Sequence, residues 1–201
     1  NINNENVIVH VKNTGRCREL LVKDTEVYLE YFLETSRKTK YDLITVNKMG
    51  RLINMDSSAP NKAVYEALQK GKDILHINEP LTHIKMEHKY KQSRFDVYAE
   101  TKTDKIFAEI KGVTLEENNI VMFPDAPIME LVDAKENGFH TYIIFVIQMQ
   151  SPAYFTPNYK THAEFGEALQ YAQSKGVNIL AYDCIITENS IDLNNQIDIK
   201  L

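Results

Sequence analysis

The first 58 residues alternate between apolar and polar positions in short runs separated by polar turns. Successive side chains of a β-strand point to opposite faces, so such runs predict strands that are buried on one face. The turn signal at residues 13–15 separates two of them. The expected strands cover residues 7–11, 26–32, 41–48 and 51–55. Short strands joined by polar turns favour a small β-barrel of the OB-fold type.

After a polar stretch at residues 56–60, the pattern changes to alternating helices and strands. Val64, Ala67 and Leu68 form an apolar stripe at helical spacing, with Asn61 as the expected cap. Thr161 and Glu164 have the spacing of a capping box. The expected elements are helix 61–70, strands 84–90, 94–100 and 105–113, helix 128–136, strand 141–149, helix 161–175 and strand 177–186. We therefore expect two domains, residues 1–58 and 59–201, the second of α/β type.

Composition narrows the class of protein. The chain has 201 residues, 43% of them hydrophobic, which is enough for one large core or two small ones. We expect no membrane span, because no run approaches the roughly 18 apolar residues that one requires. Cys17 and Cys184 form no metal-ligand spacing, which argues against a zinc site and favours free thiols in the cytoplasm. The start at Asn1 suggests that a few residues precede it, and no signal peptide is recognised there.

The net charge of −5 argues against a protein that coats nucleic acid without specificity. The charge is uneven, since residues 59–201 carry fourteen Lys and Arg against twenty Asp and Glu. An acidic excess is compatible with an enzyme that binds phosphates through Mg²⁺ or Mn²⁺. The alternative is ordinary surface charge that keeps the protein in solution.

The expected strand 105–113 carries two charges among apolar residues. Glu109 and Lys111 are two positions apart and share a strand face. Asp96 lies on the preceding strand, and a four-residue turn can fold the two strands back so that Asp96 meets Glu109. Adjacent carboxylates repel each other, and Mg²⁺ removes this repulsion through oxygen ligands, to which the Ile110 carbonyl can add. The sequence therefore predicts a metal site at Asp96 and Glu109.

A metal at this position has a defined chemistry. It lowers the pKa of a bound water and neutralises charge on a phosphate, and Lys111 is placed to orient or deprotonate that water. Asp96, Glu109 and Lys111 are thus the candidate catalytic residues. The alternative is a surface cluster of charges, because this spacing is common. The order helix, three strands, helix, strand matches that of PD-(D/E)xK nucleases and favours the site.

Three further residues are weaker candidates. Glu66 on the first helix can complete the metal shell or be a solvated helix residue. Asp125 can bind metal through water or cap the helix that follows. Arg94 shares the face of Asp96 and can hold a phosphate, or it can pair with Glu109 or Glu100.

Four cations lie in or near turns of the first domain, where an OB-type fold presents its ligand loops. We expect them to bind phosphates of nucleic acid, and solvated turn charges are the alternative. These residues are Arg16, Arg37, Lys38 and Lys40.

Several motifs together resemble the sugar fermentation stimulation protein family, SfsA, over most of the chain. They are NTG at residues 13–15, SRFD at 93–96, EIKGVTL at 109–115, FPDA at 123–126 and GVNILAY at 176–182. The resemblance implies an OB-fold-like domain, then a PD-(D/E)xK domain with DNA binding and a proposed nuclease role. It assigns catalytic positions to Asp96, Glu109 and Lys111 and matches Glu66 to the family's helix glutamate. The family name reflects a genetic link to sugar metabolism and implies no sugar chemistry.

The sequence departs from the family in one place. A polar segment like TERGxKH follows FPDA in the family, whereas here Pro127 runs directly into Ile128. The segment is either deleted or omitted from the sequence, and its loss would remove a basic phosphate clamp.

Three functions remain open at this stage. The first is a Mg²⁺-dependent nuclease acting on DNA. The second is a DNA-binding regulator on a nuclease scaffold, and the third is an RNA-processing enzyme. A homodimer also remains open. Fold alone does not choose between these functions.

Overall fold

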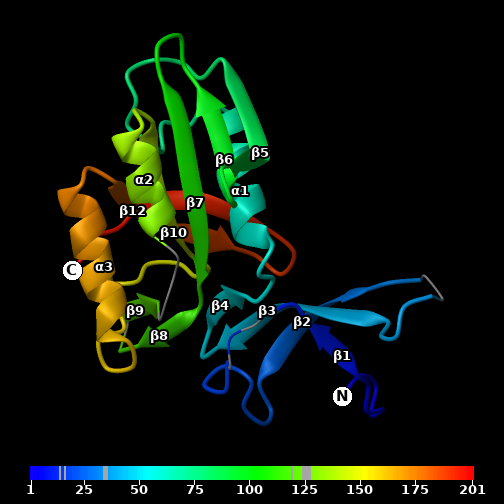
Figure 1. The fold of residues 1–201 in the computed structure, drawn as a ribbon. Coiled ribbons are helices and arrows are strands. Elements are labelled where there is room, and N and C mark those ends of the chain that lie inside the picture. The colour runs from blue at the N-terminus through cyan, green and yellow to red at the C-terminus, as the bar shows by residue number, and fades with distance from the viewer. Residues whose placement is uncertain (14, 16, 34–35, 119, 124–127) are drawn as a thin grey trace.

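The structure is a computed structural model of the chain (Figure 1) that describes residues 1–13, 15, 17–33, 36–118, 120–123 and 128–201. The N-terminal part is a four-stranded sheet in which β3 is paired on both of its edges. Its strands are β1 (Val9–Val11), β2 (Glu26–Tyr31), β3 (Tyr41–Lys48) and β4 (Arg51–Asn54). β1 runs parallel to β3, whereas β2 and β4 are antiparallel to it. The expected strands are therefore found, but in the described residues the sheet is open rather than closed into a barrel.

The second part contains a six-stranded sheet in the order β13-β12-β10-β7-β6-β5. Its strands are β5 (His83–Tyr90), β6 (Ser93–Glu100), β7 (Lys105–Val113), β10 (His140–Ile147), β12 (Asn178–Ile186) and β13 (Ile191–Gln196). β10 is parallel to both of its neighbours, β7 and β12, and the remaining pairs are antiparallel. This arrangement explains why β10 is apolar almost throughout, because a central strand is covered on both faces.

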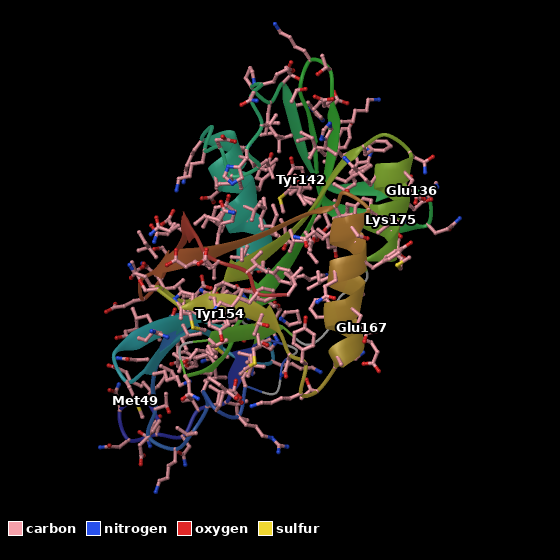
Figure 2. All side chains as sticks on the ribbon, turned by 90° about the vertical axis from the view of Figure 1, so that its left-hand side faces the viewer. Met49, Glu136, Tyr142, Tyr154, Glu167 and Lys175 are labelled. Carbon is pink, nitrogen blue, oxygen red and sulfur yellow. The ribbon has the colours of Figure 1, made fainter. Side chains whose placement is uncertain are left out.

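Helices cover both faces of this sheet (Figure 1). α1 (Ala59–Gln69) packs on one face, where its Val64 and Leu68 belong to the same core cluster as Val97 and Ala108 of the sheet. α2 (Met129–Glu136) and α3 (Ala163–Ser174) cover the other face. The outward side of α3 carries Glu167 and Lys175 (Figure 2). In the described residues, no helix is long and apolar enough to cross a membrane.

Both expected helix caps were wrong. α1 begins at Ala59 with Pro60 in its first turn, so Asn61 lies inside the helix rather than at its cap. α3 begins at Ala163 with His162 at its N-cap, and Thr161 instead donates a long hydrogen bond of 3.5 Å to the Asn158 carbonyl. In both cases the helix start is displaced by two residues, and Asn61 becomes free to contact another element.

A third, three-stranded sheet joins the two parts and was not expected from the sequence. It consists of β8 (Leu115–Glu117), β9 (Ile120–Phe123) and β11 (Tyr154–Pro157), with β9 in the middle. The core beside it contains Leu43 and Ile53 of the first sheet together with Phe145 and Phe165 of the second part. The two parts therefore share one continuous hydrophobic core.

Gln148, directly after β10, connects the end of the N-terminal sheet to the second part through hydrogen bonds. Its Nε2 donates to the Asn54 carbonyl at 3.1 Å, to Asn54 Oδ1 at 3.0 Å and to the Asp56 carbonyl at 3.1 Å. Asn54 N in turn donates to the Gln148 carbonyl at 2.9 Å. A Cβ on Gly112 would lie 2.5 Å from Gln148 Oε1, so glycine is needed on β7 for this contact.

We expect Gln148→Ala to lower the free energy of unfolding by about 1–3 kcal/mol, because it removes the side-chain donor to the buried Asn54 carbonyl and Asn54 Oδ1 and one of the donors to the Asp56 carbonyl. Urea unfolding of both proteins measures the difference. Gln173→Ala, at an exposed position of α3, is the matched control and should stay within about 0.5 kcal/mol of wild type. A Gln148 variant as stable as this control would contradict the assignment.

Candidate active site

Asp96 and Glu109 occupy facing positions on adjacent strands. β6 and β7 pair antiparallel with Val97 opposite Ala108, and the next step along the ladder places Asp96 beside Glu109. Asp96 Oδ2 accepts a hydrogen bond from the backbone N–H of Ile110 at 2.7 Å. This bond turns the Asp96 side chain towards β7, so the hairpin itself brings the two carboxylates together.

Asn61 holds the other oxygen of Asp96. Its Nδ2 donates to Asp96 Oδ1 at 2.8 Å from the first turn of α1. No sequence pattern indicates this contact, because a residue expected to cap a helix would have its side chain bonded to the backbone. Asn61 is therefore a site residue that only the position of α1 over the sheet identifies.

Lys111 lies on the same strand face as Glu109, and its Nζ is 2.7 Å from Glu109 Oε1. The two side chains are only 20% and 14% exposed. β7 is an interior strand between β10 and β6, so this pair is not a solvated cluster at a sheet edge. An ammonium and a carboxylate held in such surroundings stabilise each other's charged form.

The site carries more negative than positive charge. Burial raises the pKa of the Asp96 carboxyl, against the opposing effects of the Ile110 N–H and Lys111. Burial also raises the pKa of Glu109, and the negative charge of Asp96 raises it further. Lys111 offsets only part of this repulsion. A cation that binds both carboxylates would remove it.

Two additional glutamates surround the pair and were missed in the sequence. Glu87 on β5 stands opposite Asp96, because its neighbours Met86 and His88 pair with the residues on either side of Asp96. Its φ of 57° is a left-handed conformation that costs a non-glycine residue about 1–2 kcal/mol. Glu130 in the first turn of α2 raises the pKa of Glu109 through its charge. Neither had a recognisable motif, since only the register and the helix placement bring them near.

The weaker candidates form ion pairs with residues outside the carboxylate pair, or lie outside the described residues. Arg94 Nε pairs with Glu87 Oε2 at 2.7 Å, rather than with either acid expected as its alternative partner, and its side chain is 68% exposed. Glu66 lies within ion-pair distance of Lys62 at 3.8 Å and Lys70 at 3.5 Å, neighbours on its own helix. Asp125 and Arg16 lie outside the described residues, as does Pro127 beside the expected polar segment.

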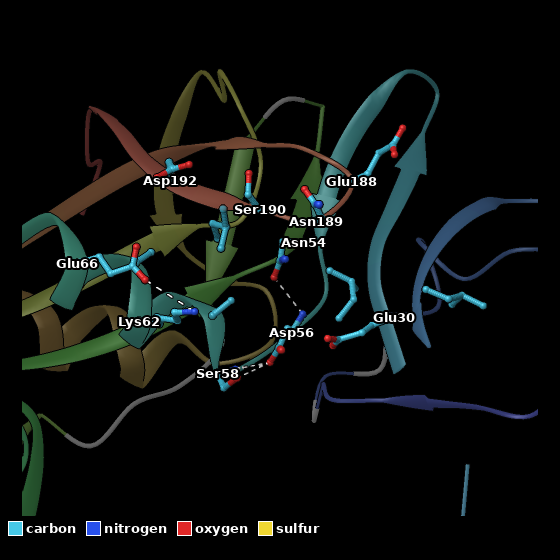
Figure 3. A pocket seen from close by; sticks show the side chains of 15 residues that line it. Glu30, Asn54, Asp56, Ser58, Lys62, Glu66, Glu188, Asn189, Ser190 and Asp192 are labelled. Atoms are coloured by element: carbon cyan, nitrogen blue, oxygen red, sulfur yellow. Dashed lines mark hydrogen bonds and ion pairs between the residues drawn. The ribbon is translucent and has the colours of Figure 1, made fainter. Parts of the chain in front are cut away.

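Glu66 lines a pocket of about 590 Å³ between α1, the first sheet and the turn that joins β12 to β13 (Figure 3). Asp96, Glu109 and Lys111 are not among its lining residues, so Glu66 and the carboxylate pair face different spaces. Among the described residues, five acids line it with a single cation, Lys62, which makes the pocket unfavourable for a phosphate. The acids are Glu30, Asp56, Glu66, Glu188 and Asp192.

The donor set of the candidate site suits magnesium better than a soft metal. Within the part of the chain that the structure describes, no group of three or more His, Cys, Asp and Glu side chains gathers at metal-binding distance. Mg²⁺ is commonly bound by only one or two carboxylates, with water and phosphate oxygens completing its shell. Asp96 and Glu109 fit that pattern.

The N-terminal cations fall into two groups. Arg37 forms an ion pair with Asp42, whose side chain is completely buried. Lys38 and Lys40 are exposed between β2 and β3. These three residues therefore lie together at one end of the first sheet.

Both parts of the chain match known protein families. Residues 1–55 match the family described as SfsA N-terminal OB domain, and residues 58–190 match the Sugar fermentation stimulation protein RE domain. The Sugar fermentation stimulation protein homolog of Ruminiclostridium cellulolyticum is 54% identical, over 96% of this chain and 87% of the relative. The homolog of Clostridium beijerinckii is 49% identical, with the same coverage of both chains.

A solved structure has the same fold. It is described as the structure of Pyrococcus furiosus SfsA in complex with Ca²⁺, and it matches with a TM-score of 0.81 over 95% of this chain and 84% of that one. Its 24% sequence identity supports the fold alone. The two family matches and the relatives establish the wider conclusion: this chain belongs to the sugar fermentation stimulation protein (SfsA) family.

Proposed function

We propose that this protein binds DNA and is a metal-dependent nuclease that hydrolyses phosphodiester bonds with Mg²⁺ or Mn²⁺. One observation carries the proposal. Two poorly exposed carboxylates, Asp96 and Glu109, face each other across neighbouring strands, with the ammonium of Lys111 at 2.7 Å from Glu109. A protein that only binds DNA has no need to place two mutually repelling carboxylates side by side.

The relative from Pyrococcus furiosus, which is described in complex with Ca²⁺, supports the choice of metal. Ca²⁺ and Mg²⁺ are both hard cations that prefer oxygen ligands. Asp96 and Glu109 would hold such an ion, and the ion would supply an activated water and neutralise phosphate charge.

The residues around the carboxylates have separate roles in this proposal. Asn61 and the Ile110 N–H orient Asp96, and each carboxylate oxygen can still accept a further interaction. Lys111 stabilises the negative charge that develops on the phosphate, or it holds a proton of the attacking water. Glu87 and Glu130 strengthen the negative potential that attracts a cation.

DNA binding is assigned to local cations rather than to net charge. Phosphate affinity comes largely from Lys and Arg, and the chain as a whole is acidic. Lys38 and Lys40 are exposed in the first sheet, and Arg94 is exposed close to Asp96. These few exposed cations favour local phosphate contacts over general coating of nucleic acid.

The metal site predicts a defined pH dependence for metal binding. Because the pKa values of Asp96 and Glu109 are raised, both begin to take up protons at a higher pH than ordinary carboxyls. Protonated carboxyls do not bind metal, so affinity for Mn²⁺ should fall as the pH is lowered, and the fall should begin at a higher pH than for a site made of ordinary carboxyls. Isothermal titration calorimetry measures it.

Variants test the same site. Asp96→Asn and Glu109→Gln should each weaken Mn²⁺ binding about tenfold or more. Glu136→Gln, at the exposed end of α2 (Figure 2), is the matched control and should bind as wild type does. Equal affinity of all four proteins would remove the assignment of the metal to this pair.

Replacing Lys111 separates a nuclease from a DNA-binding scaffold. Lys111→Ala should slow cleavage about 10²-fold or more, the usual effect of losing a positioned proton-transfer or charge-stabilising group. Nucleic-acid binding should weaken only modestly, since one cation among several contacts is lost. Single-turnover cleavage of single- and double-stranded DNA and RNA measures the rate, and circular dichroism checks the fold.

The matched control is Lys102→Ala, in the exposed turn at the other end of the same hairpin, which should leave the rate unchanged. A wild-type protein that cuts none of the four substrates with either metal would end the nuclease proposal. The DNA-binding regulator on a nuclease scaffold would then be the better description.

A further inference from the structure

The far end of the β2–β3 hairpin carries aromatic and cationic side chains that the candidate active site does not use. We call this end the hairpin tip and define it as Tyr31, Phe32, Arg37, Lys38, Lys40 and Tyr41. Figure 1 shows β2 and β3 extending away from the six-stranded sheet. Phe32 N donates to the Lys40 carbonyl at 2.8 Å, which continues the pairing beyond the strand ends.

Two tyrosines lie side by side on one face of the tip. Tyr31 and Tyr41 are directly paired across the strands, and their ring centroids are 5.2 Å apart with planes inclined by 42°. Tyr31 is 52% exposed. The pair therefore offers an accessible aromatic surface of limited mobility, because each ring packs against the other and both backbones belong to the sheet.

Arg37 is held in a fixed orientation. Its guanidinium lies 3.8 Å from the centroid of the Phe32 ring and is paired with the buried carboxylate of Asp42. Burial alone would raise the pKa of Asp42, but hydrogen bonds from Lys12 and Arg37 outweigh it and lower that pKa. Asp42 thus stays charged and anchors the guanidinium on the face of the hairpin opposite the tyrosine pair, because Tyr41 and Asp42 are successive residues of β3.

The remaining charge of the tip is positive. Lys38 and Lys40 are exposed, and within the described part of the chain no acidic side chain forms an ion pair with either. Flat aromatic surface beside free cations is complementary to an unpaired nucleotide, which has a planar base and a phosphate. Bases in a duplex are already stacked on each other, so their faces cannot reach a tyrosine.

We propose that the hairpin tip binds single-stranded nucleic acid by stacking a base on the Tyr31–Tyr41 pair, with phosphates on the exposed Lys38 and Lys40. Every base has an aromatic face, so this binding tolerates any sequence. The inference rests on the proposed function and refines it, because it names unpaired strands as the part of the substrate that the N-terminal domain selects.

Fluorescence anisotropy in EDTA tests the tip without cleavage. The probes are labelled oligothymidine and oligouridine of about 20 nucleotides and a blunt DNA duplex of the same length. Wild type should bind the single strands more tightly than the duplex. Tyr31→Ala should weaken single-strand binding about 5- to 150-fold, the range that corresponds to one lost stacking contact, and duplex binding less than about twofold.

Two controls separate stacking from general damage. Tyr31→Phe keeps the ring and should retain single-strand affinity, whereas Tyr171→Ala, a similarly exposed tyrosine on α3, should change nothing. Lys38→Ala gives an independent measurement at an exposed position. It should reduce the slope of log affinity against log salt by about 0.7, as expected for one lost phosphate contact on a single strand.

The outcomes distinguish this inference from the nuclease proposal. Equal single-strand affinity of wild type and Tyr31→Ala, or tighter wild-type binding to the duplex, overturns the inference even if the protein cleaves. Single-strand binding that depends on Tyr31 in a protein that cleaves nothing supports the tip and ends the nuclease proposal. A loss of affinity confined to oligothymidine or to oligouridine supports the inference and shows which of the two single strands the tip prefers. A wild type that binds no probe overturns the inference, and the cleavage assay with Mg²⁺ or Mn²⁺ then decides the nuclease proposal separately.

Discussion

The central constraint in this structure is the burial of carboxylates. Asp96 and Glu109 lie together on interior strands with one nearby ammonium, that of Lys111, and burial raises both pKa values. Unpaired buried charge is costly, so neighbouring groups must supply hydrogen bonds to offset it. Asn61 and the Ile110 N–H do so for Asp96. The first turn of α1 and the register of the β6–β7 hairpin are thereby tied to the same point.

The buried carboxylate of Asp42 is instead stabilised by cations that pair with it. Its carboxylate is also buried, but three basic side chains surround it: His10 at 3.4 Å, Lys12 at 3.0 Å and Arg37. Hydrogen bonds from Lys12 and Arg37 hold this carboxylate, and they lower the pKa of Asp42. One buried acid therefore organises cations at the N-terminal sheet, whereas the acid pair in the second domain leaves a deficit of positive charge. In the proposed function, this contrast corresponds to phosphate binding at the first sheet and metal binding at the carboxylate pair.

The junction between the two parts of the chain is packed and hydrogen-bonded. Gln148 bonds to the end of β4, and its neighbour Gly112 lies on β7 one residue after Lys111. The hydrophobic core continues through the junction, with Leu43 and Phe145 in the same cluster. The first sheet is therefore held against the second part by a shared core and by direct hydrogen bonds.

Local pattern in the sequence determined much of the fold and the centre of the candidate site. Alternation placed Glu109 and Lys111 on one strand face, and the unbroken apolar run over β10 marked the central strand, because both signals depend only on neighbouring residues. The four strands of the first sheet and three helices of the second domain were predicted for the same reason. The resemblance to the family then connected these elements to one fold.

Tertiary structure alone decided which distant residues meet. Asn61 reaches Asp96, Glu87 stands opposite it, and Gln148 closes the domain junction. Glu66 matched a family position but faces a separate acidic pocket. These contacts join residues tens of positions apart, or depend on a two-residue shift in a helix start or on strand register. Composition and periodicity carry no information about such pairings, because they are set by how the helices and sheets pack.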